Sequence, residues 1–136
     1  MPAKPQSPEA VARAFVKAIN RRNVDELAEL MTNEHRFIDS LGTVVEGRER
    51  MREGWAAYFR MVPDYLVTVE ETFSDGSIVV MLGVAQGTYA RNGRLRPDDF
   101  WQSPAVWRAR IKDEKVAEWR VYSDNEPIRR LIAKAK

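Results

Sequence analysis

The hydrophobic pattern of this chain changes its period at Tyr65, and that change limits the folds the chain can adopt. Before Tyr65, apolar residues recur every three or four positions, as on one face of an α-helix. After Tyr65, apolar and polar residues alternate, which is typical of strands with one buried face. Four long strands are predicted, over residues 65–73, 77–89, 100–111 and 116–123. Helices followed by a meander of strands predict an α+β domain with the helices on one face of the sheet.

The first half of the chain predicts three helices. Ser7-Pro8-Glu9 has the residues of a helix start: a hydroxyl cap, a proline at the first position and an acid in the first turn. This helix is expected to run to about Asn20. Asn23 is expected to cap a second, short helix whose apolar face ends at Met31, and a third helix is predicted over residues 48–61.

The predicted connections between the strands differ in length. Residues 74–76 and 112–114 are interpreted as hairpin turns. Residues 90–104, which are rich in charge, are interpreted as one long loop. The segment Glu126–Lys134 forms either a short terminal helix or a frayed end. Residues 1–7 are predicted to be a flexible tail, and residues 8–136 a single domain.

Composition excludes several classes of function. Without cysteine and with one histidine, the chain offers no disulfide, no thiolate nucleophile and no Cys- or His-rich metal site. We therefore expect neither a metal nor another cofactor. The net charge of +2 and the scattered basic residues predict no nucleic-acid partner. No apolar run approaches membrane-spanning length and no signal peptide is evident, so no membrane partner and a cytoplasmic location are expected.

The segment RFIDSLG, residues 36–42, places an acid at the end of a short predicted strand. Phe37 and Asp39 share one face of that strand, because side chains two apart point the same way. If Phe37 is buried, Asp39 faces the same cavity and could act as a general base. Asp39 could instead cap the following turn by accepting bonds from backbone amides. His35 shares this face but lies about 13 Å from Asp39 along the strand, too far for a direct His–Asp pair.

Four segments carry a family resemblance: AFVKAINRRNVDELAELM, FIDSLGTVVEGRERMREGW, VPDYLVTVEETFSDGSIVVMLGVAQGTY and VWRARIKDEKVAEWRVYSD. In this order they resemble the SnoaL-like and ketosteroid isomerase-like family of the nuclear transport factor two-like superfamily, over nearly the whole chain. The resemblance implies a cystatin-like cone, in which a curved, mostly antiparallel sheet wraps around a long helix next to an N-terminal helix pair. It also implies a pocket at one end and a homodimer. It does not imply one reaction, because this scaffold hosts isomerases, cyclases, hydrolases, dehydratases and binders.

Residue by residue, the resemblance to ketosteroid isomerases is incomplete. Asp39 occupies the position of their general base. Their proton donors are not matched: the tyrosine of the first helix is Phe15, the tyrosine of the third helix is Trp55, and the buried acid falls at Ala105 or Val106. A base without donors for the developing oxyanion lacks what is usually the largest catalytic contribution. Steroid isomerisation is therefore not expected.

Two other activities in the superfamily fit no better. SnoaL-like cyclases place an acid where this chain has Ala105. The limonene epoxide hydrolase relatives use a tyrosine where this chain has Phe37, an asparagine at Asp39 and an aspartate at Val121. All three comparisons have in common a polar residue at position 39 that faces the cavity.

We predict a pocket inside the cone, walled by aromatic rings around few polar groups, as small-molecule sites usually are. Alternation places Trp107 and Trp119 inward, and it turns Arg108, Arg120 and Tyr122 toward an outer face that forms a homodimer. Asp39 is the predicted catalytic residue. The predicted binding residues are Phe15, His35, Phe37, Trp55, Tyr58, Phe59, Trp101, Trp107, Trp119 and Val121.

Two functions stay open for a SnoaL-like small-molecule pocket protein. The first is a cofactor-free isomerase, cyclase, lyase or hydrolase that acts on a small hydrophobic or aromatic substrate. Asp39 would then be the general base, with Tyr58 or His35 as helpers. The second is a non-catalytic module that binds a small ligand in the pocket or assembles into a dimer through the outer face of the sheet.

Overall fold

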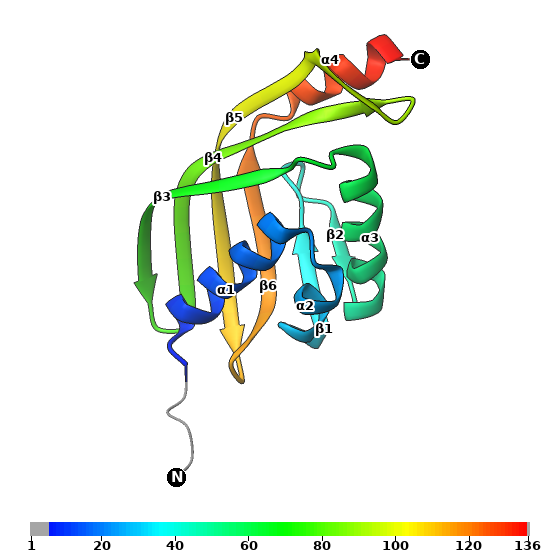
Figure 1. Ribbon diagram of the computed structural model, residues 1–136. Coiled ribbons are helices and arrows are strands. Elements are labelled where there is room, and N and C mark those ends of the chain that lie inside the picture. Colours follow the sequence, from blue (N-terminus) through cyan, green and yellow to red (C-terminus); the bar gives the residue numbers. More distant parts are fainter. Residues whose placement is uncertain (1–5, 136) are drawn as a thin grey trace.

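A six-stranded sheet curves around three helices, and a fourth helix lies at one end (Figure 1). The computed structural model describes residues 6–135. Its elements are α1 (Pro8–Arg21), α2 (Val24–Glu29), β1 (Met31–Ile38), β2 (Val44–Glu46), α3 (Arg48–Met61), β3 (Leu66–Asp75), β4 (Ile78–Arg91), β5 (Arg94–Lys112), β6 (Lys115–Ser123) and α4 (Glu126–Ala135).

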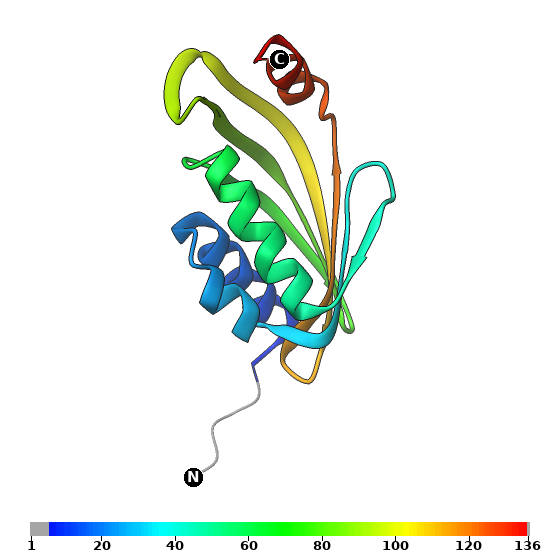
Figure 2. The ribbon, with the colours of Figure 1, turned by 90° about the vertical axis from the view of Figure 1, so that its right-hand side faces the viewer.

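The sheet order is β2-β1-β6-β5-β4-β3, and every neighbouring pair except β1–β6 is antiparallel. Figure 2 shows α1, α2 and α3 together on one side of the sheet. The predicted α+β cone with a curved, mostly antiparallel sheet is confirmed. Of the predicted tail, residues 1–5 lie outside the described residues, and the backbone N–H of Gln6 donates to the Glu114 carboxylate (2.6 Å).

Helix α1 begins where its sequence signals predict. Ser7 Oγ accepts a hydrogen bond from the Ala10 amide (3.1 Å), and Pro8 takes the first helical position, where no amide proton is needed. Near the other end, the side-chain amide of Asn20 bonds to both backbone groups of Val67 in β3 (2.9 and 2.8 Å). This pairing occupies backbone groups of an edge strand and fixes α1 against the sheet.

Strand β1 begins earlier than the sequence pattern indicates. The apolar spacing predicts Met31 on the second helix, but α2 ends at Glu29 and Met31 pairs with Val116 of β6. The Val116 amide donates to the Leu30 carbonyl oxygen (2.7 Å). A six-residue helix has little stability of its own, so backbone pairing with a distant strand decides where it ends.

The long loop predicted over residues 90–104 is wrong. Strands β4 and β5 continue through this segment and meet at Asn92-Gly93, whose φ angles are +52° and +75°. Two residues with positive φ form a tight hairpin turn, and Asn-Gly is its strongest sequence signal. That signal outweighs the surrounding charges. Pro104 is tolerated in β5 because β6 pairs only from Ala105 onward, which leaves one edge of β5 free beside the proline.

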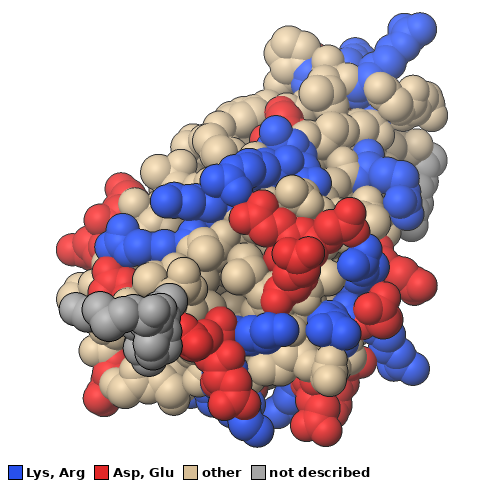
Figure 3. Space-filling view, turned by 60° about the horizontal axis from the view of Figure 1, so that its bottom comes forward, with Lys and Arg blue, Asp and Glu red and all other residues tan. Residues whose placement is uncertain are grey.

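Acidic and basic side chains both cover the lower face of the molecule (Figure 3). Charged side chains pair between helices: Arg21 of α1 bonds to Glu26 of α2 (3.0 Å), and Arg52 of α3 bonds to Asp25 of α2. Exposed pairs of this kind contribute about 0–1 kcal/mol each, so they adjust the helix packing and do not drive it. Among the helices of residues 6–135, none has the length and apolar character needed to cross a membrane.

Candidate functional site

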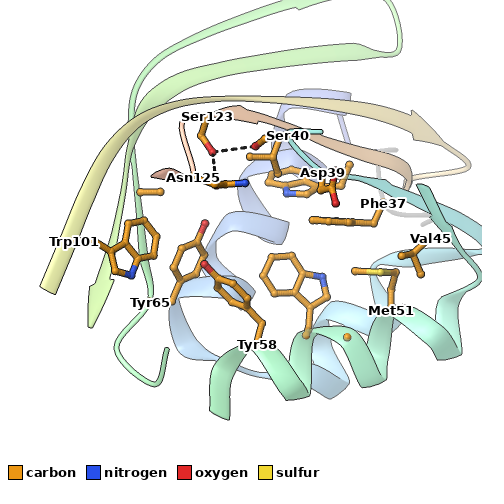
Figure 4. A pocket seen from close by; sticks show the side chains of 15 residues that line it. Phe37, Asp39, Ser40, Val45, Met51, Tyr58, Tyr65, Trp101, Ser123 and Asn125 are labelled. Carbon is orange, nitrogen blue, oxygen red and sulfur yellow. Dashed lines mark hydrogen bonds between the residues drawn. The ribbon is translucent and has the colours of Figure 1, made fainter. Parts of the chain in front are cut away.

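A pocket of about 330 Å³ lies between α3 and the concave face of the sheet (Figure 4). We call it the aromatic pocket. Strands β1, β2, β4, β5 and β6 contribute to one side of it, and α3 forms the other. Its lining residues are Phe37, Asp39, Ser40, Val45, Met51, Gly54, Trp55, Tyr58, Tyr65, Ala85, Trp101, Trp119, Val121, Ser123 and Asn125.

The walls of the aromatic pocket are rings set nearly at right angles to one another. Trp55 stands edge-on to Phe37 (centroids 6.0 Å apart, 81°) and to Tyr58 (6.3 Å, 85°). Tyr58 in turn stands edge-on to Tyr65 (5.0 Å, 85°), and Tyr65 is tilted against Trp101 (6.1 Å, 34°). Edge-to-face pairs are a favoured arrangement of aromatic side chains. The three perpendicular pairs therefore make neighbouring parts of the pocket wall face in different directions.

Three polar side chains meet at one end of the aromatic pocket (Figure 4). Ser40 follows β1, Ser123 ends β6, and Asn125 precedes α4. The Ser40 and Ser123 hydroxyls are 3.1 Å apart, and Ser123 Oγ lies 3.3 Å from Asn125 Oδ1. These neutral groups can donate and accept hydrogen bonds, so they can orient a ligand without requiring a charge on it.

Two tyrosines supply hydroxyl groups on the opposite side. Figure 4 shows the hydroxyl ends of Tyr58 and Tyr65 close together and directed away from α3 and the start of β3. Burial raises the pKa of both phenols above their usual value, and the proximity of Tyr65 raises the pKa of Tyr58 further. Both groups therefore stay protonated at neutral pH and are hydrogen-bond donors, not bases.

Asp39 is both a turn cap and a lining residue of the aromatic pocket. Its Oδ1 accepts hydrogen bonds from the amides of Leu41 (2.9 Å) and Thr43 (3.0 Å). Its own amide donates to the Thr43 carbonyl oxygen, and Gly42 turns the chain with a φ of +84°. Within residues 6–135 no hydrogen bond engages Oδ2. The two interpretations of Asp39 drawn from the sequence thus concern different oxygens of one half-buried carboxylate.

The structure divides the predicted site residues into two groups. Phe37, Asp39, Trp55, Tyr58, Trp101, Trp119 and Val121 line the aromatic pocket, whereas Phe15, His35, Phe59 and Trp107 are not among its lining residues. Those four lie in the core. Phe15 packs on Trp119 (4.6 Å) and on His35 (6.0 Å), and Phe59 stacks on Trp55 (5.4 Å). Periodicity showed which face each residue shares, but not whether another ring lies between it and the cavity.

Sequence reasoning did not include Tyr65, Ser40, Ser123 and Asn125 among the site residues. Ser123 could have been found, because it lies on the same strand face as Trp119 and Val121. Ser40 is adjacent to Asp39. No local signal identifies Tyr65 or Asn125, whose positions depend on how the chain enters β3 and leaves β6. In the part of the chain that the structure describes, no three His, Asp or Glu side chains are grouped as metal ligands would be.

Comparison with known proteins gives a family and several similar structures. Residues 12–119 match the family model described as the SnoaL-like domain. A protein described as a SnoaL-like polyketide cyclase, from Shewanella denitrificans, superposes with a TM-score of 0.80 at 16% identity, over 93% of this chain and 97% of that chain. IdmH from Streptomyces antibioticus, described as a polyketide cyclase, superposes with a TM-score of 0.77 at 20% identity, over 94% and 99% of the two chains.

A third similar structure holds a small molecule. It is a protein from Catenulispora acidiphila with a ketosteroid isomerase-like fold, in complex with trimethylamine; the TM-score is 0.71 at 20% identity, over 86% of each chain. No curated protein sequence matched this chain. At these identities the superpositions establish the fold, and the chemistry has to be argued from the pocket.

Proposed function

Because the chain belongs to the SnoaL-like domain family, we propose that it binds a small, mainly apolar molecule in the aromatic pocket. The pocket itself is the observation that carries this proposal: about 330 Å³ walled by six aromatic rings, with a few polar groups among them. Ligand sites typically have volumes of about 300–1,000 Å³ and this kind of lining. The pocket is at the small end of that range, which favours a compact ligand. The fold is also known to accept small molecules, since one similar structure is a complex with trimethylamine.

Tryptophan emission provides a direct test. Three of the four tryptophans, Trp55, Trp101 and Trp119, line the aromatic pocket, and the fourth, Trp107, does not. A library of small aromatic and alicyclic compounds is screened by thermal shift, and the hits are titrated by fluorescence. We expect saturable quenching together with a raised melting temperature, because a ligand that binds only the folded state stabilises it. No stabilising compound in a chemically diverse library would contradict the proposal.

Gly54 allows the pocket to be filled without damage to the fold. It lies in α3 and lines the aromatic pocket, and a Cβ placed there would meet only the Met51 side chain, at 3.6 Å. Glycine inside a helix is unfavourable by about 0.5–1 kcal/mol relative to alanine. We expect Gly54→Leu to keep or raise the melting temperature and to weaken binding of a screened hit at least about tenfold, a loss of roughly 1.4 kcal/mol.

Ala57→Leu is the matched control for this experiment. Ala57 is exposed on the same helix and is not a lining residue. This variant should bind as the wild type does. Equal affinities for the Gly54 and Ala57 variants would place the ligand elsewhere.

Proton-transfer catalysis is a second candidate function. It is favoured by a carboxylate, Asp39, that lines the same pocket as two protonated phenols, Tyr58 and Tyr65. Asp39 would accept a proton from a bound substrate, and a phenol would donate a hydrogen bond to the oxygen on which charge develops. These tyrosines occupy other positions than the donors expected from the family resemblance. We therefore propose Asp39 as the general base together with Tyr58 or Tyr65 as the hydrogen-bond donor.

Two substitutions of Asp39 separate its structural role from its chemical role. Asp39→Ala removes the acceptor of two backbone hydrogen bonds, so we expect it to lower the free energy of unfolding by about 1–2 kcal/mol. Asp39→Asn keeps a carbonyl oxygen for those amides and should be closer to wild type. If Asp39 is a base, both variants lose proton transfer, and the Asn variant still binds neutral ligands. Urea melts at pH 7 measure the structural role, and proton transfer that survives in the Asn variant would argue against the base.

We also propose that the outer face of the sheet forms a homodimer. Tyr122 is 45% exposed there, and the Arg120 guanidinium lies 4.8 Å from the centre of its ring. Leu82, Val106 and Tyr122 line a shallow groove on this face. Aromatic and arginine side chains are enriched in protein interfaces. Sedimentation equilibrium at micromolar concentration should give a dimer, and Val106→Glu should give a monomer that still binds ligand. A monomeric wild-type protein would refute this assembly.

A further inference from the structure

The residues that line the aromatic pocket differ from the chain as a whole in their balance of acidic and basic side chains. Among residues 6–135, Asp39 is the single carboxylic acid that lines the pocket, and no Lys, Arg or His of this part of the chain is a lining residue. The chain as a whole has 22 Lys and Arg residues against 20 Asp and Glu residues, so basic residues are not scarce. Their absence from the lining therefore has a structural cause.

Strand alternation provides that cause. Arg36 precedes the lining residue Phe37, and Arg120 lies between the lining residues Trp119 and Val121. Each arginine therefore points to the opposite face of the sheet. There Arg36 pairs with Glu118 (3.6 Å), and Arg120 stacks on Tyr122. An anionic ligand in the aromatic pocket would find a carboxylate and no positive charge to oppose it.

The walls, in contrast, suit a positive charge. The Trp55 ring stands nearly at right angles to the rings of Phe37 and Tyr58, so a group beside these three residues meets both ring faces and ring edges. The face of an aromatic ring attracts cations, and the attraction is stronger where water is excluded. Asp39 is two residues from Phe37 on the same strand face and adds a full negative charge at this side of the pocket.

We propose that the ligand of the aromatic pocket is an organic cation: a tertiary or quaternary amine that carries an apolar group. This inference rests on the proposed function and narrows its ligand class. The ammonium group lies among Phe37, Trp55 and Tyr58 near the Asp39 carboxylate. The apolar group extends toward Tyr65 and Trp101. The phenols of Tyr58 and Tyr65 stay protonated and neutral, so Asp39 is left to provide the counter-charge.

Three compounds of nearly equal shape test the charge preference. They are phenyltrimethylammonium, its neutral carbon isostere tert-butylbenzene, and 2-methyl-2-phenylpropanoate, in which a carboxylate replaces one methyl group. Binding is measured by tryptophan quenching and calorimetry on the wild-type protein. We expect the cation to bind at least about tenfold more tightly than the neutral isostere, and the anion to bind most weakly. Equal or tighter binding of the neutral compound or the anion would overturn this inference and leave the proposed function intact.

Asp39→Asn and Asp75→Asn extend the test as a matched pair. Asp39→Asn should reduce the cation-to-neutral affinity ratio several-fold and leave the affinity for tert-butylbenzene unchanged. Asp75 is exposed at the end of β3 and is not a lining residue, so Asp75→Asn should keep the wild-type ratio. An unchanged ratio in the Asp39 variant would exclude Asp39 as the counter-charge. If none of the three compounds binds, the cation inference fails, and the library screen alone then decides the broader proposal.

Discussion

Replacing Phe15 with alanine should lower the free energy of unfolding by about 3–5 kcal/mol, the usual range for truncating a buried aromatic side chain. Phe15 is fully buried. Its ring lies 4.6 Å from the ring of Trp119, 6.0 Å from His35 and 6.5 Å from Trp55, measured between centroids. The alanine variant would leave a cavity behind two rings that line the aromatic pocket. We therefore expect weaker ligand binding as well as lower stability.

Phe73→Ala is the matched control, because Phe73 is 57% exposed on β3. Removing this side chain should change the free energy of unfolding by less than about 0.5 kcal/mol, as is usual for surface substitutions. Urea melts of both variants and of the wild type provide the measurement. A loss below about 1 kcal/mol in the Phe15 variant would mean that the wall behind the pocket is not packed as described.

Acidification should destabilise the protein through its single histidine. His35 is fully buried, and burial lowers its pKa below the usual 6.5, although the Val116 carbonyl and the negative charge of Glu118 act in the opposite direction. The Val116 carbonyl oxygen can only accept, so His35 Nδ1 donates to it (2.7 Å). Nε2 is buried without a partner in the described part of the chain. The folded protein thus holds a neutral imidazole.

The sign of the pH effect follows from proton linkage. Below pH 6.5 the unfolded chain binds a proton at His35 that the folded protein does not yet bind. The free energy of unfolding therefore falls as the pH drops through 6.5, and it continues to fall until the folded state is protonated as well. Above pH 6.5 both states are neutral at this position, and the contribution is fully present.

His35→Gln isolates this contribution, since glutamine can still donate to the Val116 carbonyl and does not titrate. The free energy of unfolding of the wild type should fall relative to that of the variant as the pH drops from 8 to 5, because only the wild type loses the contribution of the neutral histidine. The other titratable groups are the same in both proteins, so their contributions cancel when the two free energies of unfolding are subtracted. The imidazole resonance of the one histidine can be followed by NMR. The prediction would be contradicted by an NMR titration midpoint of His35 at or above pH 6.5 in the folded protein. It would also be contradicted if the unfolding free energies of wild type and variant changed in parallel with pH.

Some features of this protein follow from residues that are neighbours in the sequence. The start of α1 depends on Ser7 and Pro8, and the inward position of Trp119 depends on the alternation of β6. Such features rest on local hydrogen bonds and on the geometry of one helix or strand, so the sequence predicts them. The hairpin at Asn92-Gly93 is also local. The Asn-Gly pair sets this turn, and the charged residues around it do not prevent β4 and β5 from pairing.

Other features were decided by contacts between distant segments. The end of α2 depends on pairing between Met31 of β1 and Val116, which are 85 positions apart in the chain. Ser40 and Ser123 meet in the aromatic pocket although they are 83 positions apart. The depth of a residue is equally non-local: Phe15 and Trp119 both face inward, but only Trp119 lines the pocket.

One physical reason separates the features that the sequence predicts from those that only the tertiary structure decides. Backbone hydrogen bonds within a turn or a helix, and the periods of helix and strand, relate each residue to its near neighbours. The sequence alone therefore determined the α+β class, the start of α1 and the inward face on which Trp107 and Trp119 lie. The concave shape of a cavity arises from the curvature of a six-stranded sheet against α3, which sums over many pairings between distant residues. Only the tertiary structure could decide that Asp39 shares a pocket with Tyr58 and Tyr65, and that no basic side chain of the described residues lines that pocket.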